Sequence, residues 1–219
     1  MKILRHVLSW LVTILVPLAL VFLGLRLMLT NPFLQVEYRT PGFPPDTYGF
    51  TLADRLHYAP FAVDYLVNGA GISYLGNLTF PDGTSLFNTR ELSHMQDVKV
   101  VVQAALKVGY ADWLLLLLLL AWALFGGWWR EYLLGVKRGG WLSAGLAIVL
   151  GVLASLNFWQ FFADFHGLFF QPNSWMFADS DTLIRLFPLP FWEDAFLFAG
   201  LVTCLGGLAL GIALRPRRS

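Results

Sequence analysis

Four runs of apolar residues dominate this chain of 219 residues. They cover about residues 7–29, 112–129, 141–158 and 195–214. An α-helix rises 1.5 Å per residue, so about 20 apolar residues are enough to cross the roughly 30 Å hydrocarbon core of a bilayer. The sequence therefore predicts an all-α membrane protein with four transmembrane helices, organised as a single integral membrane domain over residues 1–219.

The composition agrees with a membrane protein and excludes several classes of function. Hydrophobic residues make up 57% of the chain and charged residues 13%, a balance that is not typical of soluble globular proteins. The net charge is +1, and no basic patch with interleaved aromatic residues indicates a nucleic-acid partner. The single cysteine, Cys204, excludes a disulfide framework, a CxxC redox pair and a zinc site built from thiolates.

The basic residues predict the orientation of the chain in the membrane. Those at the ends of the apolar runs that would share one side are Lys2, Arg5, Arg130, Lys137, Arg138, Arg215, Arg217 and Arg218. The positive-inside rule places both termini and the 130–140 connection in the cytoplasm. The first run is expected to remain as an anchor, because it is long for a signal peptide and no small-x-small cleavage site follows it. The long connections, about residues 30–111 and 159–194, are then expected to face outward.

The first outward connection is predicted to be partly helical and to lie on the membrane surface. Residues 30–50 are rich in proline and glycine, so regular helix is not expected there. Residues 51–69 are typical of a helix, in which Thr51 and Asp54 form a capping box. Pro60 is expected to kink this helix or to split it.

Two more outward helices are predicted, and together these segments are expected to form a cap or a cleft. Residues 70–88 are expected to be a loop, and a helix is predicted from Asn88 to about residue 107, with Glu91 completing a capping box. In the other connection, Ser180 or Asp179 can cap a short amphipathic helix that ends near residue 187, before two prolines.

Two histidines are the strongest candidates for chemistry: His94 in TRELSHMQDV and His166 in FFADFHGLFF. An imidazole at the edge of a bilayer is costly to place without a partner, and its pKa lies close to neutral pH. Asp97 lies one helical turn after His94 and can hold its tautomer, whereas Asp164 and His166 cannot point the same way on a helix. The alternative for either histidine is the commoner one, a hydrogen-bonded structural residue, and His57, a third candidate, is expected to serve in packing.

A metal site and a serine nucleophile are weaker alternatives. The two histidines can bind a metal ion together with Asp97 and Asp164, but no HExxH or similar spacing is present. Three serines lie near the histidines in the sequence, and none is in a GxSxG frame. They are Ser93, Ser174 and Ser180.

Several segments together resemble one known family. They are NPF from Asn31, FPPDTYGFTLADRLHYA from Phe43, RELSHMQDVK from Arg90, FHGLFF from Phe165 and SDTLIRLFPLPFW from Ser180. In their order and placement they are similar to the four-span integral membrane proteins, mostly of Gram-positive bacteria, that include the lipoprotein intramolecular transacylases. The resemblance extends over nearly the whole chain.

The resemblance implies an acyltransferase of the bacterial cytoplasmic membrane that acts on diacylglyceryl-modified lipoproteins. Such an enzyme moves the sn-2 acyl chain of the S-diacylglyceryl-cysteine to the α-amino group of the same cysteine. The product is a lyso-form lipoprotein, with an N-acyl group and an S-monoacylglyceryl group. Membrane lipid surrounds the reaction, and no cofactor, metal or separate acyl donor is implied. By motif, the two outward histidines of the family correspond to His94 and His166.

Further residues are expected to support these two histidines. Asp97 is expected to orient His94, and Arg90 or Arg185 to stabilise the oxyanion of the transition state; Asp181 and Tyr58 complete the candidate set. Contact between the two histidines is expected from the topology. The alternatives are a non-catalytic lipid- or protein-binding scaffold and a membrane acyl-ester hydrolase.

Overall fold

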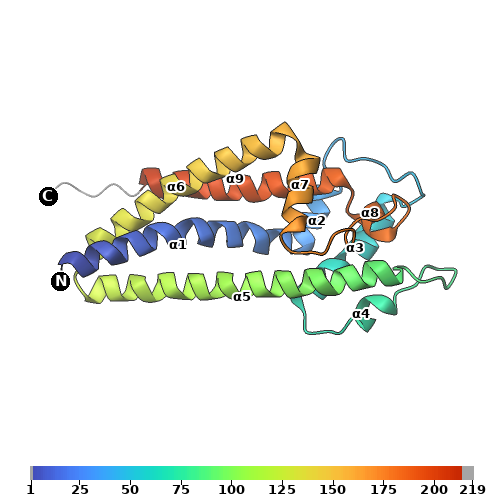
Figure 1. Cartoon of the computed structure of the whole chain (residues 1–219), viewed down its shortest axis with the longest axis horizontal. Coiled ribbons are helices and arrows are strands. Elements are labelled where there is room, and N and C mark those ends of the chain that lie inside the picture. The colour runs from blue at the N-terminus through green and yellow to red at the C-terminus, as the bar shows by residue number, and fades with distance from the viewer. Residues whose placement is uncertain (1, 214–219) are drawn as a thin grey trace. The chain divides into compact units, whose positions relative to one another are not determined.

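The structure, a computed structural model, describes residues 2–213, and this part of the chain contains nine α-helices (Figure 1). They are α1 (Lys2–Met28), α2 (Asn31–Glu37), α3 (Leu52–Val67), α4 (Ser73–Gly76), α5 (Thr89–Phe125), α6 (Trp129–Leu156), α7 (Phe158–Gly167), α8 (Thr182–Leu186) and α9 (Leu189–Ala213). Four of them, α1, α5, α6 and α9, are long and apolar enough to cross a membrane. The prediction of an all-helical protein with four candidate spans is confirmed. The basic residues Arg215, Arg217 and Arg218, which the orientation prediction used, lie outside the described residues.

The contacts divide the chain into two compact units. The first unit comprises the described parts of Met1–Arg26, Ala105–Leu156 and Leu197–Ser219, and the second comprises Leu27–Ala104 and Asn157–Phe196. The first unit therefore contains most of the apolar helix length, and the second contains both histidine segments.

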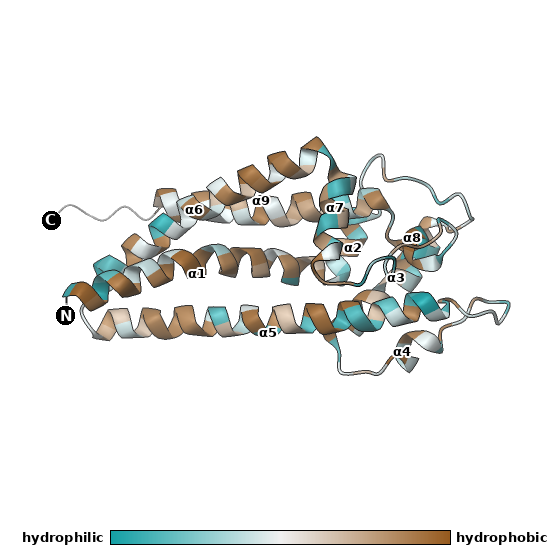
Figure 2. Ribbon diagram, viewed as in Figure 1, coloured by the Kyte–Doolittle hydropathy of each residue, from teal (hydrophilic) through white to brown (hydrophobic). Residues whose placement is uncertain are grey.

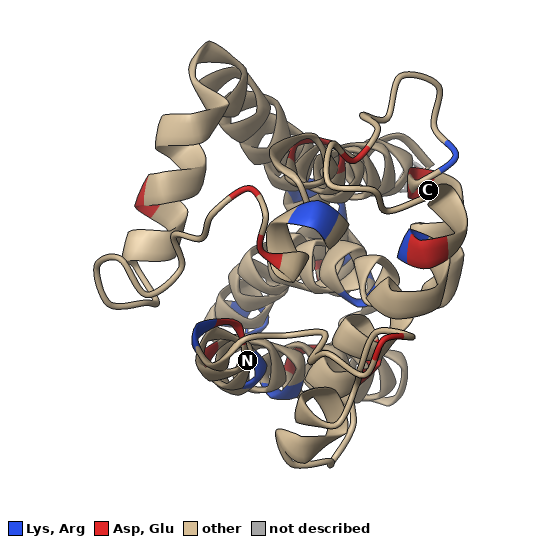
Figure 3. Cartoon of the chain, turned by 90° about the vertical axis from the view of Figure 1, so that its right-hand side faces the viewer, with Lys and Arg blue, Asp and Glu red and all other residues tan. Residues whose placement is uncertain are grey.

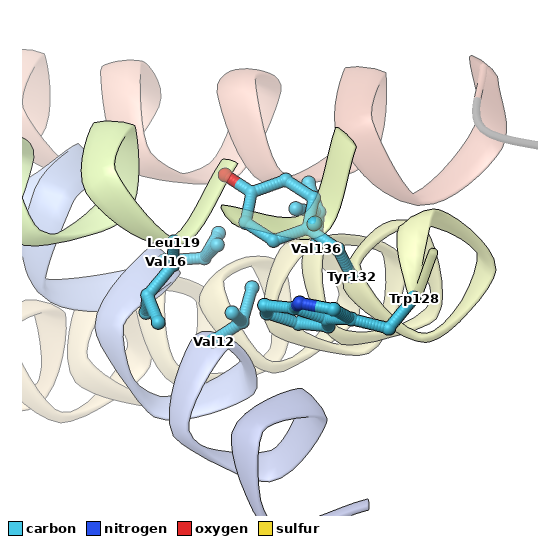
Figure 4. Close-up of a cluster of buried hydrophobic side chains, with 7 residues drawn as sticks. Val12, Val16, Leu119, Trp128, Tyr132 and Val136 are labelled. Atoms are coloured by element: carbon cyan, nitrogen blue, oxygen red, sulfur yellow. The ribbon is translucent and has the colours of Figure 1, made fainter. Parts of the chain in front are cut away.

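In the first unit, α1, α5 and α6 pack around a small apolar core (Figure 4). Its buried members are Val12, Val16, Leu119, Ala123, Trp128, Tyr132 and Val136. The indole of Trp128 is 2% exposed and meets the ring of Tyr132 edge-on, with 5.9 Å between the ring centroids. This cluster joins the start of α6 to the middle of α1.

Helices α1 and α6 approach each other closely because α6 carries glycine at the contact. Ser9 Oγ donates a hydrogen bond of 2.7 Å to the carbonyl of Glu131, and Thr13 Oγ1 donates one of 3.3 Å to the carbonyl of Gly135. A Cβ atom at Gly139 would lie 2.6 Å from Val16 Cβ, which is inside van der Waals contact. Small residues and interhelical hydrogen bonds are the usual means of helix association in membranes, where lipid is as apolar as the side chains.

The close approach predicts that the same change, glycine to alanine, affects stability very differently at two positions of α6. Gly139→Ala should lower the free energy of unfolding by about 1–3 kcal/mol, the usual cost of overpacking, and should lower the melting temperature by several degrees. Gly145→Ala, where an added Cβ meets nothing within 4 Å, should be neutral or stabilising because alanine favours helix over glycine. Thermal unfolding of both variants in detergent tests this, and equal melting temperatures would contradict the packing argument.

The second unit has its own core, to which α2, α3, α4 and α8 contribute Leu34, Ala59, Leu75 and Leu186, each fully buried. The hydroxyl of Tyr38 donates to the carbonyl of Leu186, at 2.9 Å. Figure 3 shows acidic and basic positions scattered among uncharged segments.

Two arginines join α3 and α8 to the loop that precedes α3. Arg55 donates to the carbonyl oxygens of Arg185 and Pro44, at 3.0 and 2.7 Å. Arg185 forms an ion pair of 3.1 Å with Asp46, and its guanidinium lies 3.6 Å from the centroid of the Phe50 ring. The second unit is thus held together by polar contacts as well as by apolar burial.

Both predicted capping boxes are present. Thr51 accepts from the backbone N–H of Asp54, whose carboxylate accepts in turn from the backbone of Thr51. Asn88 Oδ1 accepts from the N–H of Glu91 at 3.0 Å, and Glu91 Oε2 accepts from the N–H of Asn88 at 2.7 Å. Of the two outcomes expected at Pro60, a kink or a split, the split does not occur, because the helix is continuous from Leu52 to Val67.

The boundaries of the predicted spans differ from those of the helices. The predicted second outward helix and the second span form one helix, α5, which is polar in its first turns and apolar beyond them (Figure 2). It ends at Phe125, and the chain turns at Gly127, whose φ of 65° lies in the left-handed region that favours glycine. The expected 130–140 loop is helical, because α6 begins at Trp129.

Three helices, α2, α4 and α7, were not predicted, and one cap was assigned to the wrong residue. Helix α2 occupies part of the stretch expected to lack helix, because Pro32 lies at its start, where a missing N–H costs nothing. The short α4 lies within the predicted loop. The N-cap position of α8 is Asp181, and neither Ser180 nor Asp179 occupies it.

Candidate active site

His94 lies one turn inside the start of α5, on a rigid backbone. The capping box between Asn88 and Glu91 fixes this end of the helix, and Glu91 is only 1% exposed. Its second carboxylate oxygen accepts a hydrogen bond of 2.7 Å from the N–H of Leu183 at the start of α8. His94 itself is 9% exposed, and its Nδ1 has no hydrogen-bond partner among the described residues.

His166 lies near the end of α7, which begins at an Asn157 cap that accepts from the N–H of Gln160. Its Nδ1 lies 2.9 Å from the carbonyl oxygen of Phe162, one turn earlier. A carbonyl oxygen can only accept a hydrogen bond, so Nδ1 carries the proton. In the neutral imidazole this leaves a lone pair on Nε2. The backbone of α7 therefore selects the tautomer of His166.

The structure brings the two imidazoles together. Their ring centroids are 6.5 Å apart, and the ring planes differ by 23°. The ring of Phe170 contacts both, with centroid distances of 5.1 Å to His94 and 5.6 Å to His166. All of these residues belong to the second unit. The expected contact between the two histidine segments is therefore present.

Aromatic rings surround the rest of the histidine pair. Phe162 and Trp175 lie against His166, at centroid distances of 4.0 and 4.6 Å. Phe177 lies against His94, at 5.4 Å. Apart from these rings, the pair has few polar neighbours, which makes it a setting in which electrostatic interactions are stronger than in water.

Burial lowers the pKa of both histidines. The pKa of His94, which precedes the apolar part of α5, falls to about 4, mainly through burial and secondly through the nearby His166. Burial also lowers the pKa of His166 below its ordinary 6.5, although the hydrogen bond to Phe162 opposes the shift. Loss of hydration disfavours the imidazolium form. Both imidazoles are therefore neutral at pH 7, and each can accept a proton.

The candidate supporting residues are distributed more widely than the sequence suggested. Asp97 is exposed, and the structure does not bring it to Nδ1 of His94. Arg185 is engaged by Asp46 and by the carbonyl of Tyr48. The ring of Tyr58 contacts Phe50, Phe80 and His57, and not the pair His94 and His166.

Two of the supporting residues do connect to the histidine pair, through the loop between α7 and α8. Arg90 donates hydrogen bonds to the carbonyl oxygens of Asn173 and Met176 in this loop. Asp181 Oδ1 accepts from Asn88 Nδ2 at 3.0 Å, and its Oδ2 accepts from the N–H of Ala178 at 2.9 Å.

The remaining histidine and acidic candidates have local partners. His57 is exposed and packs its ring on Tyr58 and Phe61. Asp164 accepts from Gln160 Nε2 at 2.8 Å, so it faces away from His166, as expected for residues two apart on a helix. Within residues 2–213, no group of three or more His, Cys, Asp or Glu side chains is placed so that it could hold a metal ion.

Sequence reasoning missed how Glu91 and Phe170 serve the site. Glu91 was recognised only as part of a capping box, because the contact between its second oxygen and Leu183 joins distant parts of the chain. Phe170 contacts both imidazoles, yet it is one of 19 phenylalanines. Its place in FHGLFF, four residues after His166, is the signal that could have identified it.

Comparison with known proteins gives one consistent relationship. Residues 10–192 match the family model of the lipoprotein intramolecular transacylase Lit. An uncharacterized protein of Aquifex aeolicus (strain VF5) is 29% identical over 204 residues, which cover 93% of this chain and 91% of the relative.

Two solved structures show the same fold. The membrane-integral lipoprotein intramolecular transacylase Lit from Bacillus cereus aligns with a TM-score of 0.72 at 19% identity, over 96% of this chain and 94% of that chain. The same protein with a histidine-to-arginine mutation aligns with a TM-score of 0.70 at 17% identity, over 98% and 92%. Since the family model covers most of its length, this multi-pass membrane protein belongs to the lipoprotein intramolecular transacylase Lit family.

Proposed function

We propose that this transacylase moves the sn-2 acyl chain of an S-diacylglyceryl-cysteine to the α-amino group of the same cysteine. The product is an N-acyl, S-monoacylglyceryl lipoprotein. The observation that supports this most directly is the pair of neutral histidines, with ring centroids 6.5 Å apart, inside a shell of aromatic rings. The reaction is an O-to-N acyl transfer, which needs a proton acceptor near the amine and a proton donor near the leaving oxygen.

His166 is the residue best suited to accept the proton from the amine. Its Nδ1–H is held by the carbonyl of Phe162, which leaves the Nε2 lone pair to act as the base. The α-amino group has a pKa of about 7.7–8.0 and must lose a proton before it can attack the ester carbonyl as a nucleophile. General acid–base catalysis of this kind typically contributes about 10²–10⁴-fold to the rate.

The proposed proton transfers balance over the two steps. The amine nitrogen forms a bond to the ester carbonyl carbon while Nε2 of His166 takes its proton, which gives a tetrahedral intermediate with an oxyanion. When the intermediate collapses, the carbon–oxygen bond to the glyceryl group breaks, and the leaving oxygen takes the proton from the imidazolium of His166. An attack by an imidazole nitrogen, through an acyl-imidazole, is the alternative route.

His94 is assigned the stabilisation of the oxyanion. Burial keeps its imidazole neutral, and its Nδ1 is buried without a partner among the described residues. A buried polar atom of this kind is normally satisfied, and we assign the substrate's carbonyl oxygen as its partner. A neutral imidazole that donates an N–H to a developing oxyanion provides the electrostatic stabilisation common in acyl transfer.

The aromatic rings are proposed to contact the acyl chains and to keep water away from the ester. Exclusion of water strengthens the hydrogen bonds of the site and suppresses hydrolysis. The positive-inside distribution of basic residues supports a site that faces outward, with both termini in the cytoplasm. Diacylglyceryl-modified lipoproteins would enter this site from the outer leaflet.

The test is tandem mass spectrometry of the N-terminal lipopeptide of one lipoprotein. The lipoprotein is expressed with and without this enzyme, in a host that makes only the diacylglyceryl form. Transfer leaves the total mass unchanged and moves one chain to the nitrogen, whereas a hydrolase removes one acyl mass. An unchanged lipopeptide in the presence of folded enzyme would favour a non-catalytic scaffold and contradict the proposal.

The lowered pKa values predict the acid side of the pH profile. As pH falls, log kcat/KM should decline with a slope of about one below the amine pKa of about 7.7–8.0. The bend to a slope of two should lie below pH 6.5, because burial lowers the pKa of both histidines. A bend at or above pH 6.5 would contradict these lowered pKa values. Assays at pH 7.5 after exposure to each acidic pH control for unfolding.

A further inference from the structure

The loop between α7 and α8, residues 168–181, supplies three of the rings around the histidine pair, and we call it the aromatic loop. Phe170 contacts both imidazoles, Trp175 contacts His166, and Phe177 contacts His94. The loop turns at Asn173, whose φ is 65°. The hydrogen bonds inside the loop are local, such as Ser174 Oγ to the carbonyl of Gln171 and the N–H of Ala178 to Asp181, so contacts with other segments help to keep its rings in place.

Arg90 provides such a contact on both sides of Trp175. Its Nη2 donates hydrogen bonds to the carbonyl oxygens of Asn173, at 3.4 Å, and Met176, at 2.8 Å. The same guanidinium lies 5.6 Å from the centroid of the Phe177 ring, which in turn contacts His94. The ring of Phe177 thus contacts both Arg90 and His94, although it is far from them in the sequence.

The backbone that carries Arg90 is held in place by the cap of α5. Arg90 follows Asn88 in the capped first turn of α5, and His94 is four residues further along the same helix, on the same face. The far end of the aromatic loop is fixed to the same turn, because Asn88 Nδ2 donates to Asp181. The helix that carries one histidine therefore also holds the loop that covers both.

We propose that Arg90 is a positioning residue that latches the aromatic loop over the histidine pair and thereby favours the substrate amine over water as the nucleophile. This inference rests on the proposed transacylation. It assigns Arg90 to the loop and leaves the oxyanion to His94. Arginine suits the role because its planar guanidinium presents several donors in a fixed geometry, whereas the ammonium of lysine is a compact point charge.

Loss of the contacts between Arg90 and the aromatic loop changes the product as well as the rate of acyl transfer. With the loop displaced, a water molecule can attack the ester carbonyl carbon while His166 takes one of its protons. The tetrahedral intermediate then loses the glyceryl oxygen, which takes the proton from His166. The products are a free fatty acid and a monoacylglyceryl lipoprotein whose amine remains free. One acyl mass is lost, so mass spectrometry separates this product from the transfer product.

The experiment compares four variants with the wild-type enzyme on one diacylglyceryl lipopeptide, and measures both products. Arg90→Gln removes the positive charge and the pair of hydrogen bonds to Asn173 and Met176. Arg90→Lys keeps the charge but not the planar guanidinium. Arg39→Ala is the matched control, because this exposed arginine donates to Gln35 four residues earlier. Gly139→Ala controls for a general loss of stability in the first unit.

We expect Arg90→Gln to raise the ratio of hydrolysis to transfer several-fold, Arg90→Lys to lie between it and the wild type, and both controls to keep the wild-type ratio. An unchanged ratio in Arg90→Gln, or the same rise in Gly139→Ala, would overturn the latch. If Arg90→Gln does not fold, the ratio in Arg90→Lys decides. Absence of transfer by the wild-type enzyme would refute the proposed function itself, so the two failures are distinguishable.

Discussion

Replacing His166 by alanine should lower the rate of acyl transfer by about 10²–10⁴-fold, the usual contribution of a general base. The reason is geometric: Nδ1 is occupied by the carbonyl of Phe162, and Nε2 is the atom left to take the proton from the amine. The rate should be measured in single turnovers, so that slow product release does not mask the loss. His57→Ala is the matched control, because that exposed histidine packs on Tyr58 and Phe61.

A second substitution at position 166 separates the proposed role of Nε2 as a base from the hydrogen bond between Nδ1 and the carbonyl of Phe162. In His166→Asn, the side-chain amide can donate to the carbonyl of Phe162, as Nδ1 does now, but it cannot take up a proton at pH 7. We expect this variant to be as inactive as His166→Ala while it melts closer to the wild type. Recovery of activity in His166→Asn would show that the histidine only positions its surroundings.

Replacing His94 by alanine should lower kcat by about 10²–10³-fold, the typical loss when one donor to an oxyanion is removed. Because this hydrogen bond is made fully only in the transition state, kcat and kcat/KM should fall together. His94→Asn keeps a neutral N–H donor in a similar position and should recover part of the rate.

The asparagine variants should differ in how much activity they recover at the two histidine positions. Asparagine is expected to substitute in part for His94, the proposed hydrogen-bond donor, and not for His166, the proposed proton acceptor. If His94→Asn were no better than His94→Ala, the oxyanion role would be wrong. If both positions responded alike, a shared role such as an acyl-imidazole route would fit better. Thermal unfolding of each variant checks that the second unit is intact.

The sequence predicted those features that depend on local patterns. Both capping boxes were found, because a cap is a matter of three or four neighbouring residues. The four apolar spans and the motifs around His94 and His166 led to the family that the comparison confirms. The helix boundaries were less accurate, since α5 continues from polar to apolar sequence without a break. No local signal marks where such a helix enters the membrane.

The surroundings of the candidate site could be predicted only in part, because they depend on contacts between distant segments. Asp97 has the helical spacing to reach His94, yet it is exposed, and the spacing alone could not show this. Either Arg90 or Arg185 was expected to stabilise the oxyanion, and the structure places them against different loops. An arginine has many donors and a long side chain, so its partner is set by the tertiary fold and not by its neighbours in sequence.

The hydrogen bonds that the Glu91 carboxylate accepts from Asn88 and Leu183 also bear on the order in which the site forms during synthesis. One joins the carboxylate to Asn88 in its own helix, and the other joins it to Leu183, 92 positions later. During synthesis the first can form as soon as the start of α5 has been made, whereas the second must wait for Leu183. Contacts of such high sequence separation slow folding, because the entropy of closing the chain between them is lost before the contact is gained. The α5 turn that carries His94 therefore gains its contact with α8 only after Leu183 has been made, so a shorter nascent chain would lack it.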